Sequence, residues 1–62
     1  MDARTRAAAR KLHLAARAFI EAWQRTIEGM DDDMLIELAT KEEGLHSAAI
    51  AFADARGKEP TR

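Results

Sequence analysis

The chain has no cysteine and no tyrosine, and it contains only one proline, one tryptophan and two phenylalanines. The absence of cysteine excludes disulfide bonds and thiolate metal sites as sources of stability. No apolar run approaches the roughly 18–20 residues that a membrane-spanning helix needs. Arginine and lysine interrupt the N-terminal segment, so it lacks the apolar region of a signal peptide. We therefore expect a cytoplasmic protein without a membrane partner.

The chain is rich in alanine and in charged residues. Its 62 residues include 14 alanines, and 47% of them are hydrophobic and 34% are charged. This composition is typical of a folded helical protein and not of a disordered one. A chain of this length hides only about 60% of the surface that it exposes when unfolded. We expect one small all-α domain that gains stability from helix packing and self-association.

The longest amphipathic segment covers residues 8–30 and predicts a helix with a wide apolar stripe. In heptad notation, four of the seven positions are almost uniformly apolar. A two-helix seam needs only positions a and d, so a stripe this wide can contact more than one neighbouring helix. The residues assigned to a are Ala9, Ala16, Trp23 and Met30, and those assigned to d are Leu12, Phe19 and Thr26.

A tight turn is predicted where this helix ends. Gly29 suits a helix C-terminus, and an aspartate of the run at 31–33 suits the next N-cap, where the helix dipole favours acids. Asp2 is the matching N-cap candidate for the first helix. We predict a single domain over 1–62, with a helix over about 3–29, a turn over about 30–32, a helix over about 33–56 and a polar tail over 57–62.

The second helix has one weak point, at Gly44. Glycine costs up to about 1 kcal/mol relative to alanine inside a helix. Either the helix continues, with Gly44 allowing close approach of another backbone, or it breaks there. The apolar period resumes in phase at Leu45, which favours continuity. The residues predicted to point inward are Leu35, Leu38, Leu45, Ala49 and Phe52.

Folding the chain at the turn predicts an antiparallel hairpin in which the numbers of facing residues sum to about 61. The segment 48–53 is apolar on every side, and one partner helix cannot cover it all. Two hairpins that pair into a homodimeric four-helix bundle would cover it. The predicted core and dimer residues are Leu12, Phe19, Trp23, Leu38, Leu45 and Phe52.

No constellation in the chain points to catalysis or metal binding. The hairpin brings His13 and His46 to the same level, but zinc would need further ligands, and no HExxH or Glu-x-x-His pattern supplies them. His46 and Ser47 are adjacent in sequence and would point to different sides of a helix, so they form no dyad. We predict a protein that is not an enzyme and has no cofactor, no metal and no small-molecule substrate.

Charge is distributed unevenly along the chain. Residues 1–25 hold six basic and two acidic side chains, whereas residues 26–62 hold four basic and nine acidic ones. The basic side chains line one face of the first helix and could bind phosphates or an acidic protein surface equally well. They are Arg4, Arg10, Lys11, Arg17 and Arg25.

Several local features are similar to the Rop family of plasmid copy-number proteins. These are Ala18-Phe19-Ile20, the acidic turn from Met30, the Glu43–His46 segment and the closing Arg56-Gly57. The resemblance implies a helical hairpin that dimerises into a four-helix bundle and binds paired RNA hairpins through its first helix. The arm after Leu45 is shorter than in that family.

A second nucleic-acid alternative is a helix-turn-helix unit over residues 38–47. The glycine falls five residues after the alanine instead of four, and the recognition helix would have few base-reading side chains. We therefore rank it below RNA binding.

Three apolar residues are expected outside the main stripe, namely Leu14, Ile36 and Ile50. They are either buried in a dimer or available to a partner. We predict a small regulatory protein that binds and inhibits or modulates a larger host protein, with Rop-like RNA binding as the alternative. The Ala/Arg-rich composition suggests a bacterial or phage source.

Overall fold

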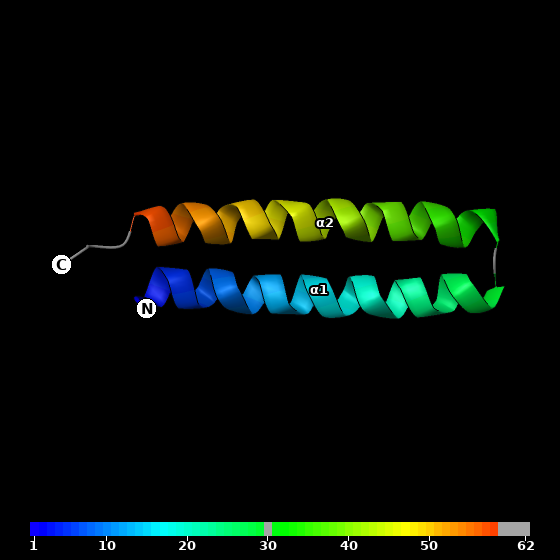
Figure 1. The fold of residues 1–62 in the computed structure, drawn as a ribbon, viewed down its shortest axis with the longest axis horizontal. Coiled ribbons are helices and arrows are strands. Elements are labelled where there is room, and N and C mark those ends of the chain that lie inside the picture. Colours follow the sequence, from blue (N-terminus) through cyan, green and yellow to red (C-terminus); the bar gives the residue numbers. More distant parts are fainter. Residues whose placement is uncertain (30, 59–62) are drawn as a thin grey trace.

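The structure is a computed structural model that describes residues 1–29 and 31–58 as two long α-helices. Helix α1 spans Ala3–Gly29 and helix α2 spans Asp32–Gly57. They lie antiparallel and side by side along their whole length (Figure 1), in a rod of 50 × 13 × 13 Å. The predicted all-α helical hairpin is confirmed. Met30 of the predicted turn and residues 59–62 of the predicted tail lie outside the described residues.

Both helices begin at a capping aspartate, as the sequence predicts. The Asp2 carboxylate accepts a hydrogen bond of 2.8 Å from the backbone N–H of Thr5, and this bond lowers the pKa of Asp2. Asp31 accepts from the N–H groups of Asp33 and Met34, at 2.8 and 3.3 Å. These bonds satisfy backbone donors that have no partner inside their helix.

Helix α2 continues without a break through Gly44. The predicted continuity is confirmed, and the turn that a helix-turn-helix unit would need within 38–47 is not formed. The expectation that Gly44 admits a close backbone is wrong within the hairpin. A Cβ atom added at Gly44 would have no heavy atom within 4 Å.

The two helices meet along a seam of fourteen side chains, seven of which are alanine or threonine. Its positions are separated alternately by three and four residues, the spacing of an antiparallel coiled coil. The only buried hydrophobic side chains among the described residues are Ala22 and Ala55. The seam consists of Thr5, Ala8, Leu12, Ala15, Phe19, Ala22 and Thr26 of α1 and Met34, Leu38, Lys41, Leu45, Ala48, Phe52 and Ala55 of α2.

Two buried threonines show the register of the hairpin. The Thr5 hydroxyl donates to the carbonyl of Ala55 at 3.3 Å. At the other end, the Thr26 hydroxyl lies 2.8 Å from the carbonyl of Ala22 and 3.3 Å from that of Met34 on α2. Both contacts between the helices join residues whose numbers sum to 60, which agrees with the predicted value of about 61.

The seam differs from the predicted core, since Ala49, which was expected to point inward, lies beside the seam and Ala48 takes its place. Trp23 and Leu35 were expected inside, but each is 49% exposed and lies beside the seam. Lys41 was not expected there, yet it is half-buried within the seam. The predicted apolar stripe is correct as a whole. Within the single chain, however, α1 buries the column of Ala8, Ala15 and Ala22 instead of the adjacent column that contains Trp23. The small side chains of that column allow the helices to approach more closely than a column containing tryptophan would.

We expect Gly44→Ala to stabilise the protein by about 0.5–1 kcal/mol, because alanine is the better helix former and its methyl group meets open space. Urea unfolding followed by circular dichroism measures this change. A loss of stability would mean that Gly44 contacts something other than the hairpin itself.

Candidate functional site

The five predicted basic residues are all exposed on α1. The helical repeat arranges them in two columns, Arg4, Lys11 and Arg25 beside the groove between the helices and Arg10 and Arg17 on the outer side. A third column lies between these two, and it contains Ala7, Leu14, Glu21 and Glu28. The predicted basic face is therefore interrupted by acids in its second half.

In the half of α1 near the turn, acidic side chains largely neutralise the positive charge. Arg25 donates a hydrogen bond of 2.8 Å to Glu37 of α2, and both side chains are about half exposed. Glu21 and Glu28 add negative charge on the same side. The cations of the first half, in contrast, form no ion pair within residues 1–29 and 31–58. Positive charge is therefore concentrated between Arg4 and Arg17.

Leu14 lies in the middle of this charge and is 58% exposed. On a helix, the surface neighbours of a residue are those three and four positions away. For Leu14 these include Arg10, Lys11 and Arg17, so three cations surround one exposed leucine. We call these four residues the Leu14 patch. The structure thereby brings together two features that the sequence suggested separately, the basic face and an outward apolar residue.

A shallow groove continues from this patch between the two helices. Its volume is about 340 Å³, and its walls are alanines with charged side chains at the rim. Lys11 belongs to both the patch and the groove. The groove is lined by Arg4, Ala7, Ala8, Lys11, Ala48, Ala51, Asp54, Ala55 and Lys58.

The other two predicted apolar contacts are not near Leu14. Ile36 and Ile50 are 66% and 57% exposed. They are fourteen residues apart and lie in one column on the outer side of α2, with Glu43 between them. They therefore form a separate surface from the Leu14 patch.

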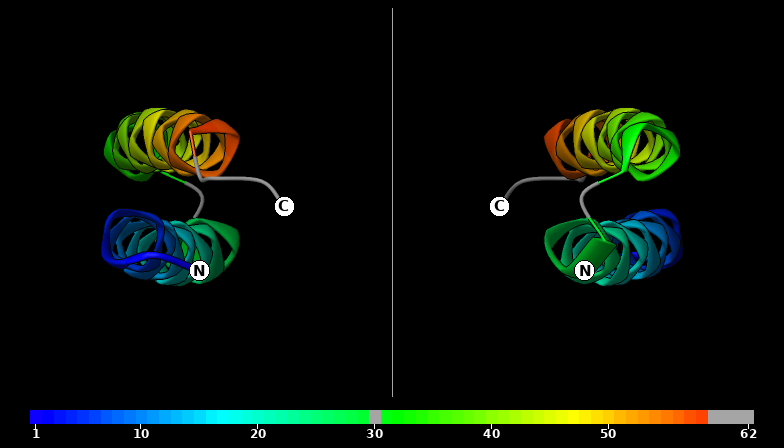
Figure 2. Two further views of the ribbon diagram at one scale, coloured as in Figure 1. Left: turned by 90° about the vertical axis from the view of Figure 1, so that its left-hand side faces the viewer. Right: turned by 90° about the vertical axis from the view of Figure 1, so that its right-hand side faces the viewer.

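A larger apolar surface lies beside the seam, and it is the part of the predicted wide stripe that the single chain leaves uncovered. Ile20, Trp23 and Ile27 follow one another at helical spacing and are 49–54% exposed. Leu35 and the small residues Ala9, Ala16 and Ala49 lie beside the seam on the same side. We call this side of the hairpin the open face. No third element covers the hairpin in the described part of the chain (Figure 2).

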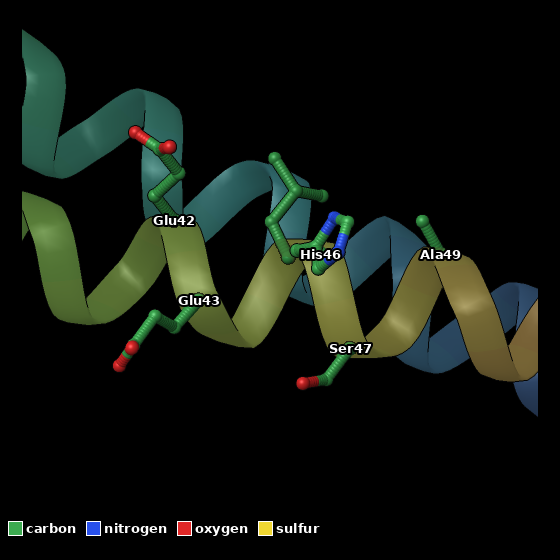
Figure 3. Close-up of a pocket in the computed structure, with 6 residues that line it drawn as sticks. Glu42, Glu43, His46, Ser47 and Ala49 are labelled. Atoms are coloured by element: carbon green, nitrogen blue, oxygen red, sulfur yellow. The ribbon is translucent and has the colours of Figure 1, made fainter.

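Two polar residues interrupt the open face on α2, namely Glu42 and His46. Figure 3 shows both side chains on the same side of α2 as Ala49, while Glu43 and Ser47 point the opposite way. His46 and Ser47 therefore point apart, as predicted. The hollow around them is open, and within the described residues no group of three or more histidine, cysteine or acidic side chains could hold a metal ion.

Compared with known protein families, curated proteins and solved structures, the chain has no match. The similarity to the Rop family therefore stays a prediction. Among the described residues, no helix is both long enough and apolar enough to cross a membrane.

Because Leu14 is exposed, we expect Leu14→Ala to change the free energy of unfolding by less than about 0.5 kcal/mol. Leu12→Ala is the matched control. It removes a half-buried seam residue two positions away and should cost about 2 kcal/mol or more. Urea unfolding of both variants tests this difference, and equal losses would show that Leu14 has a structural role.

Proposed function

We propose that this chain is a small non-enzymatic regulatory protein that binds an acidic, amphipathic segment of a larger protein through the Leu14 patch. The exposure of Leu14 among three cations carries this proposal. A helix that combines acids with apolar residues would contact the leucine with its apolar side and the cations with its acids. Positive charge around the patch would also accelerate the encounter with an acidic partner.

RNA binding is the alternative, and the charge distribution favours a protein partner. Binding along a phosphate backbone needs cations at repeated intervals. Here Glu21, Glu28 and the Arg25–Glu37 ion pair interrupt the series after Arg17. An exposed leucine at the centre contributes nothing to phosphate contacts, whereas apolar centres with charged rims are typical of protein interfaces.

The proposal includes dimerisation. The hairpin alone buries little apolar surface, and a homodimeric four-helix bundle would cover its open face. We place the protein in the cytoplasm of a bacterium, or of a phage-infected bacterium, as an accessory inhibitor or anti-activator of a host protein. The alanine- and arginine-rich composition supports this placement.

Affinity capture from a bacterial lysate tests the proposal, with one half of the lysate treated with nuclease. We expect a discrete acidic protein that survives nuclease treatment and whose recovery falls at least about tenfold with the Arg10→Glu, Arg17→Glu double variant. A tenfold loss corresponds to about 1.4 kcal/mol. The helicity of the variant should be unchanged, because both side chains are exposed.

Arg6→Glu is the matched control, since Arg6 is exposed on α1 but lies away from Leu14. It should retain the partner. Recovery of RNA that disappears with nuclease would support the alternative function, and capture that is insensitive to the double variant would overturn the role of the Leu14 patch.

A further inference from the structure

The side of the hairpin opposite the open face carries the shallow groove of about 340 Å³ that adjoins the Leu14 patch. Its walls are five alanines, Ala7 and Ala8 of α1 and Ala48, Ala51 and Ala55 of α2. An alanine side chain ends at Cβ, so walls of alanine allow another helix to approach more closely than walls of larger side chains do. We call this hollow the alanine groove.

The smooth surface of the alanine groove continues toward the middle of the hairpin. Ala18 follows Lys11 by seven residues on α1, and Gly44 precedes Ala51 by seven residues on α2. Seven residues are two helical turns, so each of these small residues lies farther along a column that borders the groove.

Ala18 and Gly44 face each other across this side of the hairpin. Their numbers sum to 62, as do those of Arg25 and Glu37, whose side chains meet between the two helices at 2.8 Å. A Cβ atom added at Gly44 would have no heavy atom of the described residues within 4 Å, so no contact inside the hairpin requires glycine there. The backbone of a further helix could approach most closely at this level, where one wall lacks even a Cβ atom.

The two ends of this side carry different charges. Near the turn, one ion pair joins the two helices. At the other end, Arg4, Lys11 and Lys58 line the alanine groove together with a single acid, Asp54. Asp54 forms an ion pair of 3.1 Å with Lys58, in which both side chains are more than 60% exposed, so the pair contributes little. Three cations around one acid favour an occupant that brings negative charge to this end.

We propose that the alanine groove holds one acidic, amphipathic helix of the partner protein, lying lengthwise between α1 and α2. Small side chains of this helix pack against Ala51 and Gly44, and its acids lie between Arg4 and Lys58 and beside Lys11. The inference rests on the proposed function and adds where the partner segment lies and what sequence it needs.

The alanine groove and the Leu14 patch belong to one continuous surface. Leu14 follows Ala7 of the groove wall by seven residues and lies in the same column, and Lys11 belongs to both sites. A helix in the groove therefore contacts the Leu14 patch along one edge, with its larger apolar side chains.

The length of this surface predicts a spacing in the partner helix. Arg4 and Ala18 are fourteen residues apart on α1, which corresponds to roughly 21 Å. A helix that runs alongside has the same rise per residue. Its small residue at Gly44 and its acid between Arg4 and Lys58 should therefore be about fourteen residues apart, with a second acid halfway between them for Lys11.

An RNA backbone is the other polyanion that these three cations could attract. Alanine walls donate no hydrogen bond to phosphate oxygens, whereas they gain from contact with apolar atoms of a helix. Farther along α1, a phosphate backbone would also approach Glu21 and Glu37. The groove therefore favours a protein helix.

Binding of a designed peptide tests the groove. The probe is a fluorescein-labelled helical peptide of about 24 residues, which spans about 36 Å, with alanine along one face and glutamate at both edges of that face. A peptide with lysine in place of every glutamate is its control. Fluorescence anisotropy should show saturable binding of the glutamate peptide to the full chain and no binding of the lysine peptide.

Two variants fill the groove without changing the seam, namely Gly44→Leu and Ala51→Leu. Each should weaken peptide binding at least about tenfold, because leucine would occupy the space that the peptide needs. Both positions are exposed and leucine is a good helix former, so the circular dichroism spectrum should not change. Ala39→Leu is the matched control, since Ala39 is exposed on α2 but lies away from the groove, and it should bind the peptide like the unmodified chain.

The outcomes separate the groove from the Leu14 patch. Binding that Gly44→Leu and Ala51→Leu leave unchanged but that the Arg10→Glu, Arg17→Glu double variant abolishes would overturn the groove and leave the patch as the site. Loss with the groove variants alone would support the groove and overturn the role of the patch. A glutamate peptide that does not bind at concentrations up to about 0.1 mM would overturn the groove as a site for an acidic helix. An RNA duplex that displaces the peptide and binds both groove variants as tightly as the unmodified chain would overturn it too.

Discussion

The packing of α1 on α2 over small side chains constrains the rest of this structure. Alanine and threonine are the residues fully buried between the helices, whereas the larger seam residues such as Phe19 and Phe52 are only half-buried. Trp23 and Leu35 lie beside this seam, and each is 49% exposed. The apolar surface needed for a stable core is therefore present but displaced onto one side of the hairpin. The hairpin therefore leaves several large apolar side chains about half exposed on that side.

Much of the fold, namely where the helices begin and that α2 is continuous, can be predicted from local features of the sequence. Asp2 and Asp31 cap the helices, and the apolar period across Gly44 keeps α2 continuous. The face that packs inside the single chain does not follow in the same way. A stripe with four apolar columns out of seven leaves the choice between adjacent columns to steric fit, and that choice moved Trp23 outside and brought Lys41 in. The charged surroundings of Leu14 became visible only when the seam was known, because the seam defines which column points outward.

The two surfaces of α1 have different chemistry and lie on different sides of the helix. The open face is apolar and is interrupted on α2 by Glu42 and His46, whereas the Leu14 patch combines one apolar side chain with Arg10, Lys11 and Arg17. A second copy on the open face would leave both Leu14 patches accessible. The dimer would then present two equivalent sites, and a partner with two acidic segments would bind more tightly than one with a single segment.

The most direct test of the proposal that a second copy covers the open face uses Trp23, the single tryptophan of the chain. Trp23 is half exposed in the hairpin and lies on the open face, which the proposed dimer would cover. Its fluorescence emission should shift to longer wavelength as the protein is diluted, with the same midpoint as the change from dimeric to monomeric mass. An emission maximum that stays constant while the mass changes would contradict the account, because the dimer would then form through another surface.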